Sequence, residues 1–317
     1  MSPRPRLARP SLTIGRIYSR SQLLALGLPE RDLSHCGVVT RVFRDRYLAS
    51  ASPIDTAARA RAALTLLPGG SLIDGVTAAR LWGGTTPDGS AITASVPMGA
   101  TVRIHGIDAT ERTRLDQRPR RQRRGIALCD PATAFTDCAG RLGLVDLVVL
   151  GDSLIKAGRI TPFDLIMAAE EMTGRHRRLA RQAAHLCRPG VDSPPETRTR
   201  LLLVLAGLPE PTPNVIIRRD DGSWERRHDL GWEAVKVAGE YDGRQHAEST
   251  SQWRHDIRRR EDSDSDGWRL VLVTAEDLYV TPEQTLRRFV AVLRQRGMNA
   301  RICRDEWRRY FPGRSAY

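Results

Sequence analysis

Two apolar segments near the C-terminal end, "VKVAGEYD" and "WRLVLVT", constrain the fold of this chain more than any other feature. Both have the composition of strands, and the polar segment between them, "STSQWRHDIRRREDSDSDGW", has the composition of a helix. A strand–helix–strand unit connects right-handedly, which makes its two strands parallel. We therefore expect an α/β domain built around this parallel pair.

The flanking segments complete that domain. "SPPETRTRLLLVLAGLP" predicts a helix with Ser193 as N-cap, Pro194 at the first position and Glu196 at the third. "NVIIRRDDGSWERRHDLGW" predicts two antiparallel strands closed by "DDGS", and "TPEQTLRRFVAVLRQRG" predicts an amphipathic helix packed on the sheet. The resulting sheet is mixed, and the Pro-rich break at "CRPGVDSPPE" starts the domain near residue 190.

The N-terminal segment "SRSQLLALGLPERDL" predicts two short helices, the first capped by Ser19 or Ser21 and ended by Gly27, the second turning Leu33 inward. "VVTRVFRDRYL" then alternates apolar and basic residues, as a hairpin does. This order predicts a winged helix-turn-helix, which binds a DNA groove and its phosphates. A small helical domain that binds protein is the alternative. The residues expected on DNA here are Arg31, Arg41, Arg44 and Arg46.

The middle of the chain predicts helices and strands. "SPIDTAARARAALTLLPGG" and "SLIDGVTAARLWGG" predict helices with Ser52 and Ser71 as N-caps, paired with Asp55 and Asp74. "ITASVPMGATVRIHGIDATERTRL" is strand-rich, whereas the basic "DQRPRRQRRGIALCD" predicts a solvated connector. Helices are expected from "DPATAFTDC" onward. We assign structural roles to the acids of that part, Asp130, Asp137, Asp146 and Asp152.

The charge of the chain favours a nucleic-acid partner. The formal net charge is +13, and nearly all positive charge is Arg, with Lys only at Lys156 and Lys236. A planar guanidinium binds phosphate through two hydrogen bonds and stays protonated. A GC-rich genome would account for the ratio of Arg to Lys, but not for the net charge.

Composition also bears on where in the cell the protein is expected. No apolar run approaches the roughly 20 residues that a bilayer requires, so no membrane partner is expected. The basic start "MSPRPRLARP" lacks a following apolar segment and predicts a disordered arm rather than a signal peptide. Five scattered Cys without a CxxC pair disfavour zinc fingers and a disulfide framework, which indicates a reducing cytoplasm.

The N-terminal half resembles AbiEi-type antitoxin-like proteins, which are common in actinobacteria. The resemblance spans about residues 15 to 170 and rests on "SRSQLLALGLPERDL", "RDRYLA", "DGVTAARLWG" and "DPATAFTDCA…DSLIKAGRITPFDL". It implies a DNA-binding winged helix more firmly than it implies a role in a toxin–antitoxin system.

The C-terminal part is similar to an uncharacterised domain family related to very short patch repair endonucleases, within the PD-(D/E)XK nuclease superfamily. "SPPE", "RHDLGW", "GEYDGRQH", "WRHDIRR" and "DGWRLVLVT" carry the similarity over about residues 190 to 297. It implies a restriction-endonuclease-like fold. The catalytic residues it implies are Glu196, Asp229, Glu240, Asp242 and His246, and the helix residues Arg254 and Arg259 are expected to form ion pairs or to bind phosphate.

The carboxylates suit a hard cation. Asp229 ends one strand and Glu240 lies near the end of its neighbour, while Glu240 and Asp242 leave their strand by the same face. Carboxylate oxygens are preferred ligands of Mg²⁺, so these three residues form a candidate site for Mg²⁺ or Mn²⁺. Asp242 stands where the superfamily has Lys, which shifts water activation toward the metal, a carboxylate or His246.

The expected fold is thus a multidomain α+β protein. Its expected parts are a basic arm (1–14), a winged helix-turn-helix (15–50), a mixed middle domain (51–189), the nuclease-like domain (190–297) and a basic tail (298–317). A Mg²⁺-dependent endodeoxyribonuclease, a phosphodiester hydrolase acting on DNA, is favoured. One alternative is a non-catalytic antitoxin-like regulator with a degenerate nuclease domain, because relatives keep apolar residues where this chain has "REDSDSDGW". An interaction module of a defence system is another, and a homodimer stays open.

Overall fold

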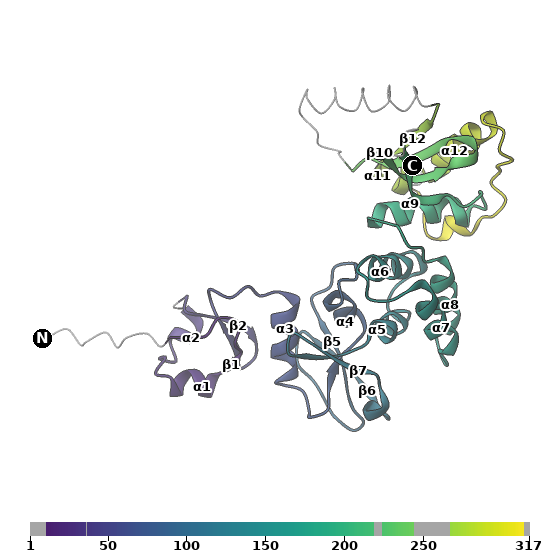
Figure 1. Ribbon diagram of the computed structural model, residues 1–317. Coiled ribbons are helices and arrows are strands. Elements are labelled where there is room, and N and C mark those ends of the chain that lie inside the picture. Colours follow the sequence, from purple (N-terminus) through teal and green to yellow (C-terminus); the bar gives the residue numbers. More distant parts are fainter. Residues whose placement is uncertain (1–10, 36, 219–223, 244–266, 314–317) are drawn as a thin grey trace, which may run out of the picture. The chain divides into compact units, whose positions relative to one another are not determined.

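The chain combines helices with three separate sheets, as expected for an α+β protein (Figure 1). The computed structural model describes residues 11–35, 37–218, 224–243 and 267–313. They belong to two compact units, residues 1–141 and 142–317. Most of the predicted arm, Cys36, the whole "DDGS" turn, the predicted crossover helix as far as residue 266 and the last four residues lie outside the described residues. No described helix has both the length and the apolar character needed to cross a membrane.

The first unit begins with a small three-stranded antiparallel sheet of order β1-β3-β2. Ser19 caps the first helix in a capping box with Gln22, and Gly27 follows the helix at a φ of 84°. Leu33 is buried, as predicted. The elements are β1 (Tyr18–Ser19), α1 (Arg20–Ala25), α2 (Asp32–His35), β2 (Val39–Phe43) and β3 (Arg46–Ala49).

The rest of this unit is a five-stranded sheet of order β6-β5-β4-β8-β7 with three helices. Strand β4 pairs antiparallel with β5 and parallel with β8, so the sheet is mixed. Its elements are α3 (Thr56–Leu64), β4 (Leu72–Ile73), α4 (Gly75–Leu81), β5 (Ile92–Pro97), β6 (Ile107–Arg112), η1 (Leu115–Gln117), β7 (Arg120–Arg123), β8 (Ile126–Cys129) and α5 (Pro131–Cys138).

The two serine caps predicted for α3 and α4 are wrong. Asp55 is the N-cap of α3, and its carboxylate accepts a hydrogen bond of 2.7 Å from the Ala58 amide. Asp74 precedes α4, because Leu72–Ile73 is drawn into the sheet as β4 and delays the start of the helix. Ser52 accepts instead from the Gly15 amide at 2.9 Å.

The basic connector is also not a solvated loop. Most of it is the hairpin β7–β8, which turns at Arg124 and Gly125 with positive φ at both positions, 49° and 73°. A two-residue turn of this kind matches the twist of antiparallel strands. Ile126 and Leu128 are buried in the sheet while the arginines of β7 remain mostly exposed, so the charge run forms the solvent side of an edge strand.

The second unit contains a helical layer and a four-stranded sheet. The helices α6 (Leu144–Lys156), α7 (Pro162–Glu171), α8 (Arg177–Leu186) and α9 (Pro194–Leu205) come first. The boundary predicted near residue 190 falls between α8 and α9. Helix α9 has the predicted cap, with Ser193 accepting from the Glu196 amide and Pro at the first position.

The sheet of this unit has the order β12-β11-β10-β9. Strands β11 and β12 pair in parallel, with Val237 opposite Arg269, which confirms the pairing predicted from the sequence. The elements are β9 (Thr212–Arg218), β10 (Trp224–Trp232), η2 (Glu233–Val235), β11 (Val237–Tyr241), β12 (Arg269–Val273), α11 (Ala275–Tyr279), α12 (Pro282–Gln295) and η3 (Glu306–Arg309).

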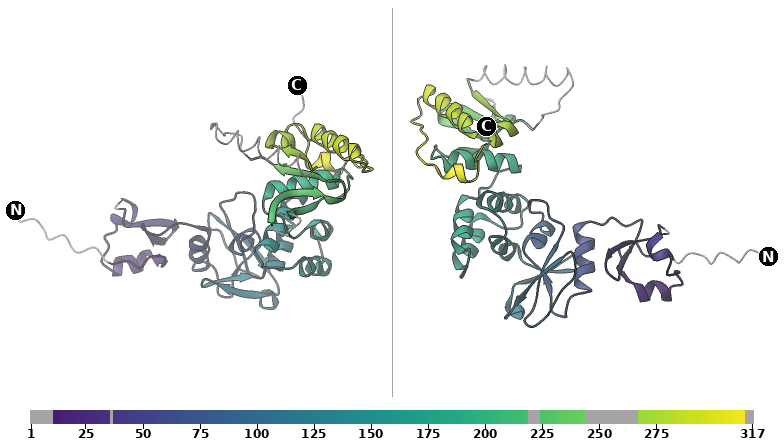
Figure 2. Two further views of the ribbon diagram at one scale, coloured as in Figure 1. Left: turned by 45° about the horizontal axis from the view of Figure 1, so that its top comes forward. Right: turned by 180° about the vertical axis from the view of Figure 1, so that it is seen from behind.

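Helix α12 packs on one face of this sheet (Figure 2). A Cβ at Gly239 would lie 3.1 Å from Cζ of Phe289, so a larger residue there would require the Phe289 ring to move. The segment predicted as a basic tail is packed as far as residue 313, since Trp307 and Phe311 are each about 1% exposed.

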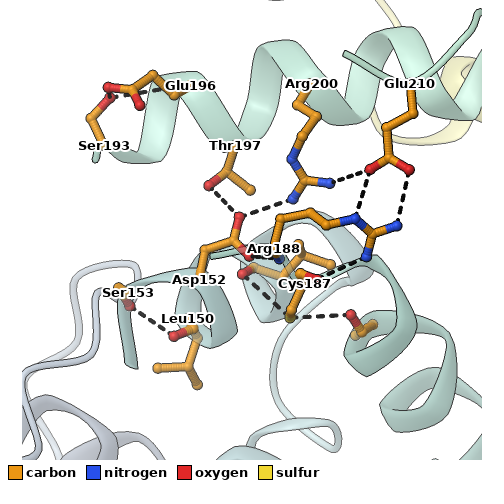
Figure 3. A network of polar contacts seen from close by, with 12 residues as sticks. Leu150, Asp152, Ser153, Cys187, Arg188, Ser193, Glu196, Thr197, Arg200 and Glu210 are labelled. Carbon is orange, nitrogen blue, oxygen red and sulfur yellow. Dashed lines mark hydrogen bonds and ion pairs between the residues drawn. The ribbon is translucent and has the colours of Figure 1, made fainter. Parts of the chain in front are cut away.

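A buried ion pair joins α9 to the helical layer (Figure 3). Nη2 of Arg200 donates to Oδ2 of Asp152 at 2.9 Å, and both side chains are almost fully buried. Thr197 donates to the same oxygen, and the Arg188 amide donates to Oδ1 at 2.7 Å. Burial raises the pKa of Asp152, and the Arg200 charge opposes that rise. The structural role predicted for Asp152 agrees with these contacts.

Removing one charge of this pair should destabilise the second unit strongly. We expect Asp152→Asn to cost about 3–5 kcal/mol, because it leaves the Arg200 guanidinium buried without its main counter-charge. Asp146→Asn is the matched control, since Asp146 pairs with Arg198 at a partly exposed position, and it should cost at most about 1 kcal/mol. Urea unfolding followed by circular dichroism measures both; equal effects would contradict the assignment.

A second buried polar cluster lies in the first unit, between β5 and α5. Ser95 donates to Asp74, while Arg118 and Arg112 pair with Asp137. Burial raises the pKa of Asp137 to about 6, the nearby Asp74 adds to the rise, and Arg118 opposes it.

Because the pKa of Asp137 is higher in the folded chain than in the unfolded chain, its contribution to stability is full below about pH 4 and is lost as the pH rises through about 6. We expect Asp137→Asn to remove this dependence, so that its stability relative to the wild type improves from pH 4.5 to pH 7. Thermal unfolding across this range measures the difference. The exposed Asp116→Asn should keep the wild-type pH profile, and an unchanged profile in Asp137→Asn would refute the assignment.

Candidate active site

Asp229, Glu240 and Asp242 lie at one end of the β10–β11 pair, where their side chains make different contacts. The regular ladder between these strands runs from Trp232 opposite Val237 to Leu230 opposite Gly239. Just beyond it, Oδ2 of Asp229 accepts a hydrogen bond of 2.9 Å from the Tyr241 amide. The Asp229 carboxylate therefore lies against the backbone between Glu240 and Asp242.

Asp242 directly follows β11. Its amide donates to the Val273 carbonyl at 2.7 Å, which extends the parallel pairing by one bond beyond Tyr241. Asp242 and Asp229 are both partly exposed, so ligand can reach the carboxylates at this strand end.

Glu196 approaches the same strand end from the first turn of α9. Its Oε1 accepts from the Ser193 hydroxyl and its Oε2 from the Asp192 amide, each at 2.8 Å. Burial raises the pKa of Glu196, these hydrogen bonds oppose the rise, and the negative charge of Asp229 adds to it. The Glu196 and Asp229 carboxylates are thus close enough to interact electrostatically, while both oxygens of Glu196 already accept hydrogen bonds at the start of α9.

Glu240 is held differently. Its Oε1 lies 2.5 Å from Nδ1 of His228, and both side chains are buried. Because Gly239 faces Phe289, strand alternation turns Glu240 to the opposite face of the sheet, where the His228 ring lies 5.5 Å from that of Trp268.

His228 is the residue of this site that the sequence did not single out. It stands directly before Asp229 in "RRHDLGW", and its Nε2 is buried without a hydrogen-bond partner among the described residues. A histidine in a predicted strand beside a strand with a buried acid was the available signal. It could not be used, because the regular β10–β11 ladder ends at Leu230 and only the structure shows which face His228 takes.

Carboxylate oxygens, such as those of Asp229 and Asp242, are ligands that hard divalent cations prefer, and Glu240 could serve as one only by sharing or giving up its contact with His228. Within the described ranges, no three or more His, Cys, Asp or Glu side chains form a group that could hold a metal ion. His246, Arg254 and Arg259, predicted for catalysis and phosphate contact, lie outside those ranges.

The arginines predicted to bind DNA differ in how far their side chains are exposed to solvent. Arg31 has 87% of its side chain exposed, and Arg41 and Arg44 are exposed on and beside β2. Arg46 is instead committed within the unit: Nε donates to Oγ1 of Thr65 at 2.7 Å, and Nη1 pairs with Asp45 at 3.1 Å. Arg46 fastens the hairpin to the end of α3.

Comparison with known proteins identifies no family. No family model matches the chain, and no curated protein matches it. Among solved structures, the RV2827C protein from Mycobacterium tuberculosis is similar at 12% identity with a TM-score of 0.38, over 58% of this chain and 74% of that chain.

The contact between His228 and Glu240 should stabilise the sheet. We expect His228→Leu to lower the free energy of unfolding by about 1–3 kcal/mol, because the buried Glu240 loses a hydrogen-bond donor. His228→Asn retains a donor and should recover part of the loss. The exposed Glu233→Gln, on the turn after β10, is the control and should leave the urea midpoint unchanged. A His228→Leu midpoint equal to that of the control would contradict the role of this contact.

Proposed function

We propose that the protein binds DNA through its N-terminal region and hydrolyses phosphodiester bonds with Mg²⁺ or Mn²⁺ at the end of the β10–β11 pair. The hydrogen bond from the Tyr241 amide to Asp229 carries the proposal, because it brings that carboxylate to the strand end that holds Glu240 and Asp242. Helix α9, strands β10 and β11, and the parallel strand β12 follow the order expected of a restriction-endonuclease-like domain.

The chemistry proposed for these residues follows from their charge. A bound divalent cation neutralises the phosphate and lowers the pKa of a bound water, which supplies the nucleophile. Asp229 and Asp242 would hold the ion, and Glu196 would orient water near it while capping α9. Glu240 would join them after exchanging its His228 partner.

The N-terminal region supports the DNA-binding half of the proposal. Helices α1 and α2 with the β1-β3-β2 sheet have the composition and order of a winged helix-turn-helix, with Arg31 directly before α2 and Arg41 and Arg44 on the hairpin. These exposed guanidinium groups suit phosphates. The net charge of +13 predicts affinity that falls steeply as salt is raised.

The test is cleavage of single-stranded, double-stranded and mismatched DNA by the full chain, with Mg²⁺, Mn²⁺ or EDTA. We expect nicking that requires the metal and falls at least about 100-fold in Asp229→Asn, which keeps the size of the side chain but removes its charge. Glu233→Gln is the matched control: it neutralises one exposed acid on the turn after β10, and it should cleave at the wild-type rate. Circular dichroism checks the folding of each variant.

A second candidate is a DNA-binding regulator that does not cleave. The buried pairing of Glu240 with His228 favours it, because this acid is engaged by a side chain where a nuclease would need it at a metal. This candidate predicts DNA binding that is unaffected by Mg²⁺ and by Asp229→Asn. Binding without metal-dependent cleavage of any of the three DNA forms would refute the nuclease proposal for those substrates and leave the regulator standing.

A further inference from the structure

A basic cavity of about 890 Å³ lies in the first unit, between the β2–β3 hairpin on one side and α3 with the loop before β6 on the other. Its size falls in the range of small-molecule sites. Four arginines line it: Arg41 and Arg44 from the hairpin, Arg59 from α3 and Arg103 from the loop before β6. None of them forms an ion pair with a described carboxylate.

The carboxylate that lines this cavity does not neutralise its four arginines. Asp45 is its single lining carboxylate, and Asp45 is already occupied by Arg46 at 3.1 Å and by the Arg20 amide at 3.1 Å. Arg41, Arg44 and Arg103 are exposed at its rim, so their guanidinium groups can reach a ligand. Three such groups around one opening suit a ligand with two or more negative charges, such as linked phosphates.

The interior offers a different surface. The guanidinium of Arg59 lies over the ring of Phe43, 5.7 Å from its centre, and both line the cavity together with Leu66 and Ile104. Gly106 closes this side, and a Cβ there would lie 3.2 Å from Cε1 of Phe43. A planar guanidinium backed by an aromatic ring is a stacking surface for a flat base.

We propose that this cavity binds a nucleoside diphosphate or triphosphate, with the phosphates on Arg41, Arg44 and Arg103 and the base against Arg59. The ligand bridges the hairpin and the loop before β6. Arg41 and Arg44 are also expected on DNA, so nucleotide and DNA would compete for them; this competition alone rests on the proposed DNA binding.

The test is isothermal titration of the full chain with ADP, adenosine and inorganic pyrophosphate, in EDTA and 0.15 M salt. EDTA keeps the candidate metal site of the second unit out of the measurement, and no DNA or cleavage enters it, so the result is independent of the proposed function. We expect ADP to bind at least about tenfold more tightly than either adenosine or pyrophosphate, because neither compound carries both the charge and the ring.

Substitutions locate the binding. Arg44→Ala and Arg103→Ala remove exposed charges from opposite sides of the cavity, and each should weaken ADP binding about tenfold or more. Arg121→Ala, at an exposed position of β7 away from the cavity lining, removes the same charge and should leave binding unchanged. Melting curves verify that the variants fold. Absence of ADP binding, equal binding of pyrophosphate, or equal weakening by Arg121→Ala would each overturn the proposal.

Discussion

The buried ion pair between Asp152 and Arg200 is the interaction on which the second unit depends. Moving two charges out of water is unfavourable. Here the hydrogen bonds from Thr197 and the Arg188 amide to Asp152 offset part of that desolvation. Thr197 and Arg200 both belong to α9, so one carboxylate on α6 sets the position of that helix (Figure 3). The same helix presents Glu196 to Asp229.

The candidate site consists of two arrangements at neighbouring strand ends. In one, Asp229 binds the backbone of β11 and interacts electrostatically with Glu196. In the other, Glu240 is buried with His228 beside Trp268. The buried Glu240 must break its contact with His228 before it can bind a metal ion, whereas the partly exposed Asp229 is open to solvent. The proposed cleavage therefore requires Glu240 to share or give up its contact with His228.

Patterns carried by neighbouring residues were predictable from the sequence. The Ser193 cap, the hairpin that contains Arg41 and the inward turn of Leu33 rest on contacts a few residues apart, and the structure has all three. The parallel pairing of β11 with β12 was predictable as well, because the handedness of a strand–helix–strand connection leaves little choice. These outcomes share a cause: each depends on local geometry or on one general rule of chain connection.

Other features were decided by partners distant in the chain. The basic connector became the hairpin β7–β8 because β4 pairs with Leu128, and Asp74 became the residue before α4 because the same sheet takes Leu72. The identity of Glu240 as an acid at a strand end was determined by the sequence alone. That its carboxylate faces His228 was decided only by the tertiary structure, since the face a side chain takes depends on how two strands pair around Asp229.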